Sequence, residues 1–410
     1  MKLAPKGMRD VLPEDALFRE EVIAKIKSVF RTYGFVTIET PALEYLSTLR
    51  AKGGEEIDKQ IFVLDDKELG LRFDLTVPLA RVAATNAFTK PFKRYAIAPV
   101  WRKEEPQKGR FREFYQADVD IVGTKSMRAE AEILTIARDV LAVLGFPNIR
   151  ILINNRKILD ALAKELDIEN KKEAVFRLLD KLDKVGEEKV KQEMNEVIGK
   201  DKTKKLFEIF DTKGDNKKKL MVAEKITKEG AQELKEIISL CNFPVEIDLA
   251  LVRGLGYYTG PVFEIRASDT IGSVAGGGRY DNLLNVYGQA DYATGISLGL
   301  ERIIILLKER IQSLQKTPTR LFVAGVKPEL YTEVVTIATE LRKNGIPTEV
   351  DLNERNLRKQ LEYVNSLSIP FMIVVGEREL KEGKFTLRDM KTGKEEFGSL
   401  KEIIKRLQFV

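Results

Sequence analysis

Two segments in which apolar and polar residues alternate, on either side of a short basic loop, limit the possible folds of this chain more than any other part of the sequence. They lie in residues 92–123, FKRYAIAPVWRKEEPQKGRFREFYQADVDIVG. Strand side chains alternate between the two faces of a sheet, so each stretch gathers its polar residues on one face. If the two strands pair as a hairpin, one face collects Arg102, Glu104, Phe114, Gln116 and Asp120. Such a face suits a nucleotide and a small polar substrate. The alternative for the hairpin alone is a charged edge that faces solvent.

The chain contains no histidine, and this limits the chemistry that it can perform. Histidine is excluded as a general base, a phosphate acceptor and a metal ligand. Any catalysis must use carboxylates, arginine, lysine, tyrosine, backbone dipoles or a bound metal. This favours phosphate chemistry that depends on positioning and charge stabilisation. The single cysteine, Cys241, excludes an intrachain disulfide and a cysteine-based zinc site.

Size and charge are compatible with a protein that binds a polyanion. The 410 residues, 43% of them hydrophobic, are enough for two or three domains. No apolar run reaches the length of a membrane span, and the N-terminal MKLAPKGMRD lacks the apolar region of a signal peptide. We therefore expect a cytoplasmic protein without a membrane partner. The net charge of +6 permits a polyanionic partner, although a Lys/Glu-rich surface adapted to heat would have a similar composition.

The N-terminal region predicts a long helix followed by a strand. Residues 13–33 carry apolar side chains at helical spacing and acids in the first turn, and Gly34 follows. Residues 35–49, FVTIETPALEYLSTL, are predicted as a strand that is broken at Pro41. Such a pair forms either part of a core or a subunit contact.

Three further segments are expected to belong to the same domain. Residues 71–76, LRFDLT, alternate between apolar and polar side chains. We expect a strand there that places the Asp74 carboxylate and the Thr76 hydroxyl on one face. Residues 127–144 predict a helix, and residues 149–155 predict a short buried strand.

The amino-acid composition changes in the middle of the chain. Between residues 157 and 243, Lys/Glu-rich helical segments alternate with breakers at Gly186, Gly199 and Gly214. We predict a helical insertion that carries no chemistry of its own.

Two glycine-containing segments follow the insertion. The run Gly276–Gly278 allows a backbone to approach a ligand closely, or forms only a flexible turn. Residues 294–311 predict a strand that passes into a helix at Gly299, with Arg302 in the first turn. Backbone N–H groups and an arginine at a helix start attract phosphate. Neither segment matches a Walker loop or a dinucleotide fingerprint.

The last part of the chain predicts a separate module. Residues 313–320, SLQKTPTR, form a predicted linker. Alternating strand and helix patterns beyond it indicate an α/β module of about ninety residues, a size that folds independently. Its basic connector at 353–359, NERNLRK, is not accompanied by a catalytic cluster, which favours a binding role.

Taken together, these motifs resemble the histidyl-tRNA synthetases, a family of class II aminoacyl-tRNA synthetases. The helix and strand that end at Pro41 match motif one, residues 100–121 match motif two, and residues 295–303 (GISLGLERI) match motif three. Residues 253–264 (RGLGYYTGPVFE) and 275–283 (AGGGRYDNL) are similar to the two histidine-specific motifs. The resemblance covers essentially the whole chain.

The resemblance implies an α+β fold with an antiparallel-sheet catalytic domain, a helical insertion and a C-terminal α/β anticodon-binding domain. The first part of the catalytic domain would span residues 1–156 and the insertion 157–243. The second part of the catalytic domain would span 244–316 and the anticodon-binding domain 317–410.

The implied activity is the ATP-dependent attachment of L-histidine to its tRNA through a histidyl-adenylate. The nucleophile would be the substrate's own carboxylate, which needs no general base and so agrees with a histidine-free chain. The implied catalytic residues are Arg253, Arg102 and Gln116. The implied ATP-binding residues are Arg102, Glu104, Arg110, Phe114 and Arg302. Mg²⁺ would accompany the ATP, and no metal would be bound by protein side chains alone.

The implied histidine-binding residues are Asp74, Thr76, Gln116, Asp120, Tyr258 and Tyr280. Asp74 and Thr76 would hold the α-ammonium group, and Asp120 and Tyr258 would contact the two imidazole nitrogens. A site that pairs both nitrogens rejects an apolar analogue strongly, because the analogue leaves buried polar groups unpaired.

The resemblance also implies macromolecular partners. Gln107 and Arg112 in the motif two loop would meet the acceptor end of the histidine tRNA, and the C-terminal module would hold its anticodon. A homodimer is implied by the family and by the motif one element.

Three positions depart from the pattern of many relatives. Gly256 stands where RGLDYYTG carries an aspartate, and Glu105 stands where many bacterial relatives carry an arginine. Asp120 replaces the glutamate of bacterial enzymes, as in archaeal and eukaryotic ones.

A non-ligase paralogue is the main alternative. The regulatory subunit of ATP phosphoribosyltransferase binds histidine but typically lacks the anticodon module and the arginine of the RGL motif. This chain has both, at 317–410 and at Arg253. A prolyl or threonyl enzyme of the same class would lack the two histidine-specific stretches.

Overall fold

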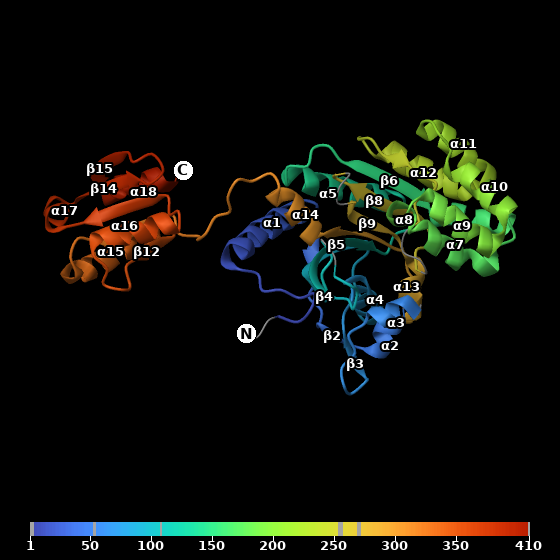
Figure 1. The fold of residues 1–410 in the computed structure, drawn as a ribbon, viewed down its shortest axis with the longest axis horizontal. Coiled ribbons are helices and arrows are strands. Elements are labelled where there is room, and N and C mark those ends of the chain that lie inside the picture. The colour runs from blue at the N-terminus through green and yellow to red at the C-terminus, as the bar shows by residue number, and fades with distance from the viewer. Residues whose placement is uncertain (1–3, 52–54, 107–108, 253–256, 269–271, 409–410) are drawn as a thin grey trace. The chain divides into compact units, whose positions relative to one another are not determined.

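The computed structural model describes residues 4–51, 55–106, 109–252, 257–268 and 272–408 (Figure 1). The chain divides into two compact units, Met1–Asp10 with Val22–Arg310 and Val11–Glu21 with Ile311–Val410. None of the helices in the described ranges combines the length and apolar character needed to cross a bilayer. The boundaries predicted at residues 156, 243 and 316 stay predictions.

The first unit is built on an eight-stranded sheet in the order β1-β4-β5-β10-β9-β8-β6-β7. Its central pairs are antiparallel, and only the outer pairs β1–β4 and β6–β7 are parallel. The predicted α+β class with a large antiparallel sheet is confirmed. In sheet order, the strands are β1 (Val36–Thr37), β4 (Phe92–Trp101), β5 (Glu113–Val122), β10 (Ala293–Gly299), β9 (Ser273–Arg279), β8 (Pro261–Arg266), β6 (Arg150–Asn155) and β7 (Glu246–Ile247).

The predicted hairpin is the pair β4 and β5. Asp118 lies opposite Ala96, and Gln116 lies opposite Ala98. Directly opposed residues point to the same face of a sheet, so the predicted shared face is confirmed. β4 ends at Trp101, and Arg102 therefore lies in the loop rather than in the strand.

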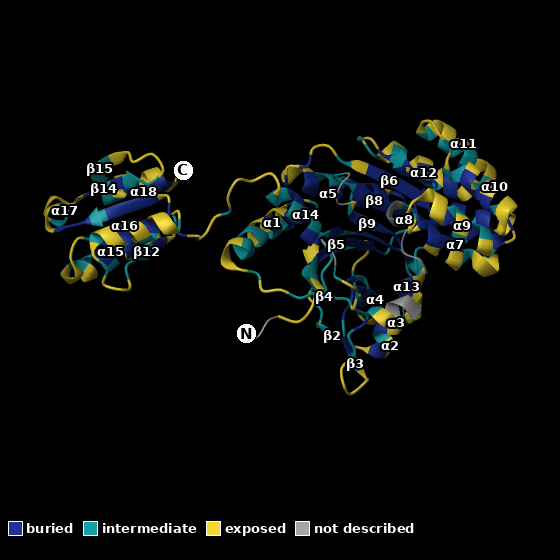
Figure 2. Ribbon diagram, in the orientation of Figure 1, coloured by how far each residue is buried: buried dark blue, intermediate teal, exposed yellow. Residues whose placement is uncertain are grey.

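Helices cover this sheet and bury their apolar stripes. The long N-terminal helix α1 (Pro13–Thr32) and the helix α5 (Arg128–Val143) both form where the apolar spacing predicts them. α5 packs against β10, and α14 (Leu300–Lys308) packs against β5. Figure 2 shows the strands of the sheet as the buried layer beneath them.

The predicted strand over residues 35–49 is largely wrong. After β1 the chain forms β2 (Leu43–Tyr45) and then the short helix α2 (Leu46–Arg50). β2 pairs with β3 (Leu69–Leu71) in a separate two-stranded sheet. A further short helix, α3 (Glu55–Gln60), precedes β3.

The predicted strand over residues 71–76 is also wrong, because β3 ends at Leu71 and a helix begins at Thr76. The Asp74 Oδ1 atom accepts a hydrogen bond of 3.0 Å from the Val77 N–H group. A carboxylate that satisfies one of the free N–H groups of a first turn stabilises the start of a helix. The helix α4 (Thr76–Thr85) therefore begins at the last residue of the predicted strand.

The middle of the chain is helical, as predicted, and the helices lie together in the green and yellow part of Figure 1. They have an apolar core of their own that includes Phe176, Met194 and Phe207. Gly186 and Gly199 stand at helix ends with φ of +86° and +84°, which are values that favour glycine. The helices are α6 (Arg156–Glu165), α7 (Lys172–Leu179), α8 (Leu182–Val185), α9 (Glu187–Ile198), α10 (Lys200–Phe210), α11 (Asn216–Ile226) and α12 (Lys228–Leu240).

The second unit is an α/β module with a five-stranded sheet in the order β12-β11-β13-β14-β15. Its strands are β11 (Leu321–Gly325), β12 (Thr348–Val350), β13 (Phe371–Val375), β14 (Lys384–Asp389) and β15 (Glu395–Ser399). Its helices are α15 (Tyr331–Lys343), α16 (Leu357–Ser366), α17 (Glu377–Glu382) and α18 (Leu400–Gln408). The predicted alternation is confirmed as far as β13, while the hairpin of β14 and β15 and the helix α18 were not predicted.

Candidate active site

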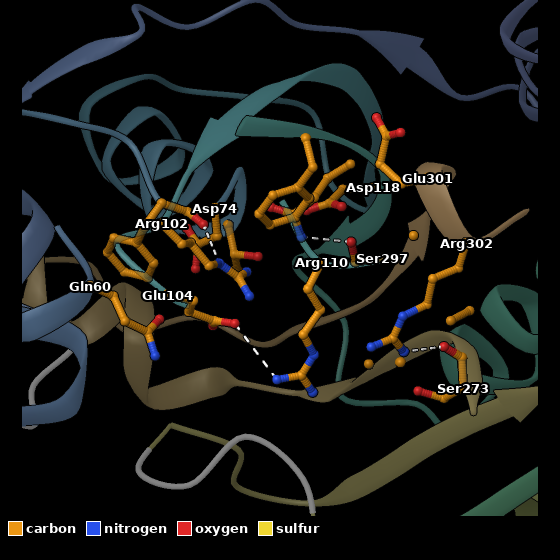
Figure 3. A pocket seen from close by; sticks show the side chains of 18 of the residues that line it. Gln60, Asp74, Arg102, Glu104, Arg110, Asp118, Ser273, Ser297, Glu301 and Arg302 are labelled. Atoms are coloured by element: carbon orange, nitrogen blue, oxygen red, sulfur yellow. Dashed lines mark hydrogen bonds and ion pairs between the residues drawn. The ribbon is translucent and has the colours of Figure 1, made fainter. Parts of the chain in front are cut away.

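A cavity of about 880 Å³ lies on the face of the main sheet that carries the polar side chains of β5 (Figure 3). Of the predicted site residues, those that line it are Asp74, Thr76, Arg102, Glu104, Arg110, Phe114, Gln116, Asp120, Tyr258, Tyr280 and Arg302. These residues come from distant segments, and the fold brings them around one space.

Three predicted residues are not placed in this cavity. Arg112 does not line it, because its Nε atom donates to the Glu104 carbonyl at 3.1 Å and its Nη2 atom lies 3.6 Å from the Glu105 carboxylate. Gln107 and Arg253 lie outside the described residues, as does Gly256.

One end of the cavity is basic. The Arg102 Nε atom donates to the Phe73 carbonyl at 2.9 Å, and its guanidinium carbon lies 5.0 Å from the centre of the Phe114 ring. Arg110 lies within 3.7 Å of the Glu104 carboxylate. Figure 3 shows the Arg110 and Arg302 side chains ending well apart from the Asp118 carboxylate. Guanidinium groups of this kind suit the phosphates of a nucleotide.

Arg302 stands where the sequence predicts it, in the first turn of a helix. β10 ends at Gly299 and α14 begins at Leu300 without an intervening loop. The Arg302 Nη1 atom donates to the Ser273 carbonyl at 2.5 Å, which fixes the side chain beside the helix start. The positive end of the helix dipole and this guanidinium therefore act on the same part of the cavity.

The other end of the cavity is acidic and buried. The Asp120 carboxylate pairs with the Arg94 guanidinium at 2.8 Å, and the Tyr280 hydroxyl donates to its Oδ1 atom at 2.6 Å. Burial, followed by the nearby Asp120 charge, raises the pKa of Tyr280 well above its ordinary value. Tyr280 therefore stays protonated and remains a donor, so Asp120 is held in one orientation.

Glycines leave room for these side chains on the sheet. The run Gly276–Gly278 lies inside β9, so the flexible-turn alternative is wrong. Gly295 in β10 lies opposite Asp120, and a Cβ atom at that position would stand 1.9 Å from Asp120 Oδ1. The Asp120 carboxylate can occupy its position only because this residue has no side chain.

Sequence reasoning gave no role to Asp118, although the alternation along β5 already placed it on the same face. Its side chain lines the cavity and is only 2% exposed. Burial, followed by the neighbouring Asp120 charge, raises the pKa of Asp118 to about 7, while Arg94 and a hydrogen bond with Ser297 lower it.

The insertion also contributes to the lining of the cavity, which the sequence did not predict. Arg177, Asp180 and Lys181, at the end of α7 and just beyond it, line the cavity. Helical periodicity predicted α7 but gave no sign that its C-terminal end faces a site on another segment.

The N-terminal segment holds the loop that follows β4. The Arg9 guanidinium carbon lies 3.6 Å from the centre of the Phe111 ring, and Arg9 forms an ion pair with Glu301. The Gly7 carbonyl accepts from the Arg112 N–H group at 2.8 Å. The first residues of the chain thus tie this loop to the start of α14.

Comparison with protein families decides the identity of the chain. The sequence model described as Histidyl-tRNA synthetase matches residues 7–303, and the model described as Anticodon binding domain matches residues 320–409. The chain belongs to the histidyl-tRNA synthetase family. Curated relatives named histidine–tRNA ligase include one from Korarchaeum cryptofilum, 40% identical with 94% of this chain and 95% of that protein covered. Another, from Aeropyrum pernix, is 38% identical over 98% of this chain and 97% of that protein.

Solved structures of the histidyl-tRNA synthetase family have the same fold. The crystal structure of histidyl-tRNA synthetase from Nostoc sp. PCC 7120 matches with a TM-score of 0.86 and 31% identity over 98% of each chain. A structure from Bacillus halodurans, described as an ATP phosphoribosyltransferase regulatory subunit/histidyl-tRNA synthetase, matches with a TM-score of 0.74 at 23% identity. It covers 88% of this chain and 96% of its own, and at that identity it shows the fold alone.

Proposed function

We propose that this chain is a histidine–tRNA ligase that activates L-histidine with ATP and transfers it to the histidine tRNA. The observation that carries the proposal is one cavity with a basic end for a triphosphate and a buried acidic end that includes Asp120. Relatives named histidine–tRNA ligase over nearly the full length support the same activity.

The nucleotide would occupy the basic end. Adenine would stack on Phe114 and be contacted by Glu104. Arg102 would hold the α-phosphate, while Arg302 and Arg110 would face the rest of the triphosphate. Their guanidinium groups act where water is partly excluded, so they stabilise the charge that develops on the phosphate oxygens.

Activation requires little beyond this positioning. A histidine carboxylate oxygen forms a bond to the α-phosphorus, the bond from that phosphorus to the bridging β-phosphate oxygen breaks, and pyrophosphate leaves. Gln116 and Arg253 would lie at the reacting groups. The carboxylate is already ionised and needs no general base. A terminal ribose hydroxyl of the tRNA then forms a bond to the carbonyl carbon of the adenylate. The bond from that carbon to the phosphate oxygen breaks, AMP leaves, and the hydroxyl proton is released to solvent.

The acidic end would select the imidazole ring. Asp120, oriented by Arg94 and Tyr280, would accept from one ring nitrogen, and the Tyr258 hydroxyl would pair with the other. Asp74 and Thr76, at the start of α4, would hold the α-ammonium group. An apolar analogue would leave these buried groups unpaired, at a cost of about 1–3 kcal/mol for each.

The nucleotide end also contains a carboxylate that suits Mg²⁺ bound with ATP. Glu301 lines this end, and carboxylates are the side chains that this hard cation prefers. Mg²⁺ bound with ATP would neutralise phosphate charge. We assign no metal to protein side chains alone.

The remaining assignments follow from family membership. Arg112 and Gln107 would contact the tRNA acceptor end from the motif two loop, and the second unit would bind the anticodon. We propose a cytoplasmic homodimer, with the catalytic domain at 1–156 and 244–316, the insertion at 157–243 and the anticodon-binding domain at 317–410.

Histidine-dependent exchange of pyrophosphate into ATP tests the activity. We expect exchange with histidine and none with proline or threonine. A histidine-binding regulatory subunit of ATP phosphoribosyltransferase would bind histidine without exchange, and that result would refute the ligase assignment.

A further inference from the structure

Two buried acceptor atoms face the cavity without a partner. Asp118 Oδ1 and Gln116 Oε1 have no hydrogen-bond partner among the residues that the structure describes. Both side chains are nine-tenths or more buried and both line the cavity. A buried acceptor without a partner costs free energy, so such a pair in a native site indicates a missing donor.

The hydrogen bonds of Ser297 fix both side chains in this arrangement. Ser297 lies opposite Asp118 on β10, and its hydroxyl is hydrogen-bonded to the Asp118 carboxylate. A carboxylate only accepts, so the single hydroxyl proton points to Asp118. Ser297 Oγ must then accept from Gln116, whose Nε2 atom lies 2.8 Å away. The amide nitrogen is therefore used, and the amide oxygen is the atom left facing the cavity.

The charges around these two atoms favour a cation. The Asp118 carboxylate is close enough to both Asp74 and Asp120 for each charge to raise its pKa. Arg94 pairs with Asp120 at 2.8 Å and offsets one negative charge. No ion pair to Asp118 occurs in the described part of the chain. A bound ammonium group would relieve the repulsion among the carboxylates.

We propose that Asp118 Oδ1 and Gln116 Oε1 form an acceptor pair for the α-ammonium group of the bound amino acid, and that Asp118 determines the specificity for a substrate with a free amine. An ammonium group has three N–H donors, which match Asp118, Gln116 and one group of the Asp74 and Thr76 pair. This inference rests on the proposed function and adds a specificity-determining residue to it.

A matched pair of inhibitors tests the inference on the full chain. Histidinol and 3-(imidazol-4-yl)propan-1-ol share the imidazole ring and the alcohol and differ only in the amine. We would measure their inhibition constants against histidine-dependent ATP–pyrophosphate exchange. In the wild-type protein we expect histidinol to bind more tightly by about tenfold to a hundredfold, the range for a buried charged hydrogen bond.

Asp118→Asn should lower that ratio by at least about tenfold, since an amide does not offset the ammonium charge. Asp120→Asn should weaken both inhibitors, because both carry the imidazole ring, and should lower the ratio by less than Asp118→Asn does, because Asp120 is already paired with Arg94. Ser297→Ala should lower the ratio without changing any charge, and it decides the matter if Asp118→Asn does not fold. An unchanged ratio in the folded Asp118→Asn protein, or in Ser297→Ala in its place, would overturn the inference. Absence of histidine-dependent exchange in the wild-type protein would instead overturn the proposed function.

Discussion

Asp118→Asn should stabilise the ligand-free protein, and the gain should grow with pH. The pKa of Asp118 is raised from 3.8 to about 7 in the folded protein. The folded state therefore binds more protons than the unfolded state between these values, and stability falls as pH rises through this interval. At about 1.4 kcal/mol per pKa unit, ionising this buried group costs the fold about 4 kcal/mol above pH 7 and about 2 kcal/mol at pH 5.

The asparagine variant avoids that cost and can still accept from Ser297. We expect the difference in unfolding free energy between the variant and the wild type to increase by about 2–3 kcal/mol from pH 5 to pH 8. The single tryptophan, Trp101, lies at the end of β4. Its fluorescence during urea unfolding therefore reports on the unit that contains Asp118. Asp120→Asn is the matched control on the same strand, and it should destabilise the protein because it leaves the Arg94 charge buried without its partner. An Asp118→Asn effect that does not change with pH would refute the reasoning.

Three further variants test the site. Gly295→Ala should raise the KM for histidine at least about tenfold with little change in the KM for ATP, because its Cβ atom would stand 1.9 Å from Asp120 Oδ1. Gly299→Ala on the same strand, whose nearest new contact is 3.5 Å, is its folding control, and an unchanged histidine KM would contradict the steric argument. Arg9→Ala should raise the KM for ATP several-fold, because Arg9 holds Phe111 and Glu301 at the nucleotide end. Its control is Lys6→Ala, which removes only an exposed ion pair with Glu105 and should change the KM for ATP less than about twofold. Equal effects of these two variants would argue against positioning by Arg9. Tyr280→Phe should raise the KM for histidine about tenfold, because it removes the 2.6 Å hydrogen bond that orients Asp120. An unchanged KM for histidine in exchange kinetics would argue against that role.

Period-two alternation predicted the face of β4 and β5 because both strands are long and paired along their whole length. The same pattern failed at residues 71–76, where Asp74 satisfies a helix N–H group. An alternating hexapeptide does not distinguish a strand from the approach to a helix, since an aspartate such as Asp74 can either face one side of a strand or accept from an N–H group of a first helical turn. Glycines at 276–278 were similarly ambiguous, because their use inside β9 depends on how closely the backbones of the neighbouring strands approach, with Gly295 beside Gly277 and Pro261 beside Gly278.

Site residues that belong to a sequence motif could be predicted, whereas residues that reach the site only through tertiary contacts could not. Arg302 follows Gly299 at a strand–helix junction, which is visible in the sequence. The contributions of Arg177 and Arg9 are not visible there, because they depend on how α7 and the N-terminal segment pack against the sheet. Asp118 lay on the predicted face, but its importance comes from the Ser297 hydroxyl on a strand almost 180 residues away.

The position of β10 has a consequence for biosynthesis. This strand is the last of the eight to leave the ribosome, yet it lies between β5 and β9 at the centre of the sheet. Until residues 293–299 have been made, β5 and β9 each present an unpaired edge, and unpaired edges are where nascent chains associate wrongly. The sheet can therefore close only after about three-quarters of the chain has been translated, in a single late step that brings Gly295 beneath Asp120 and Ser297 beside Asp118. Translation speed through this stretch would affect the yield of folded protein more than speed through the helical insertion.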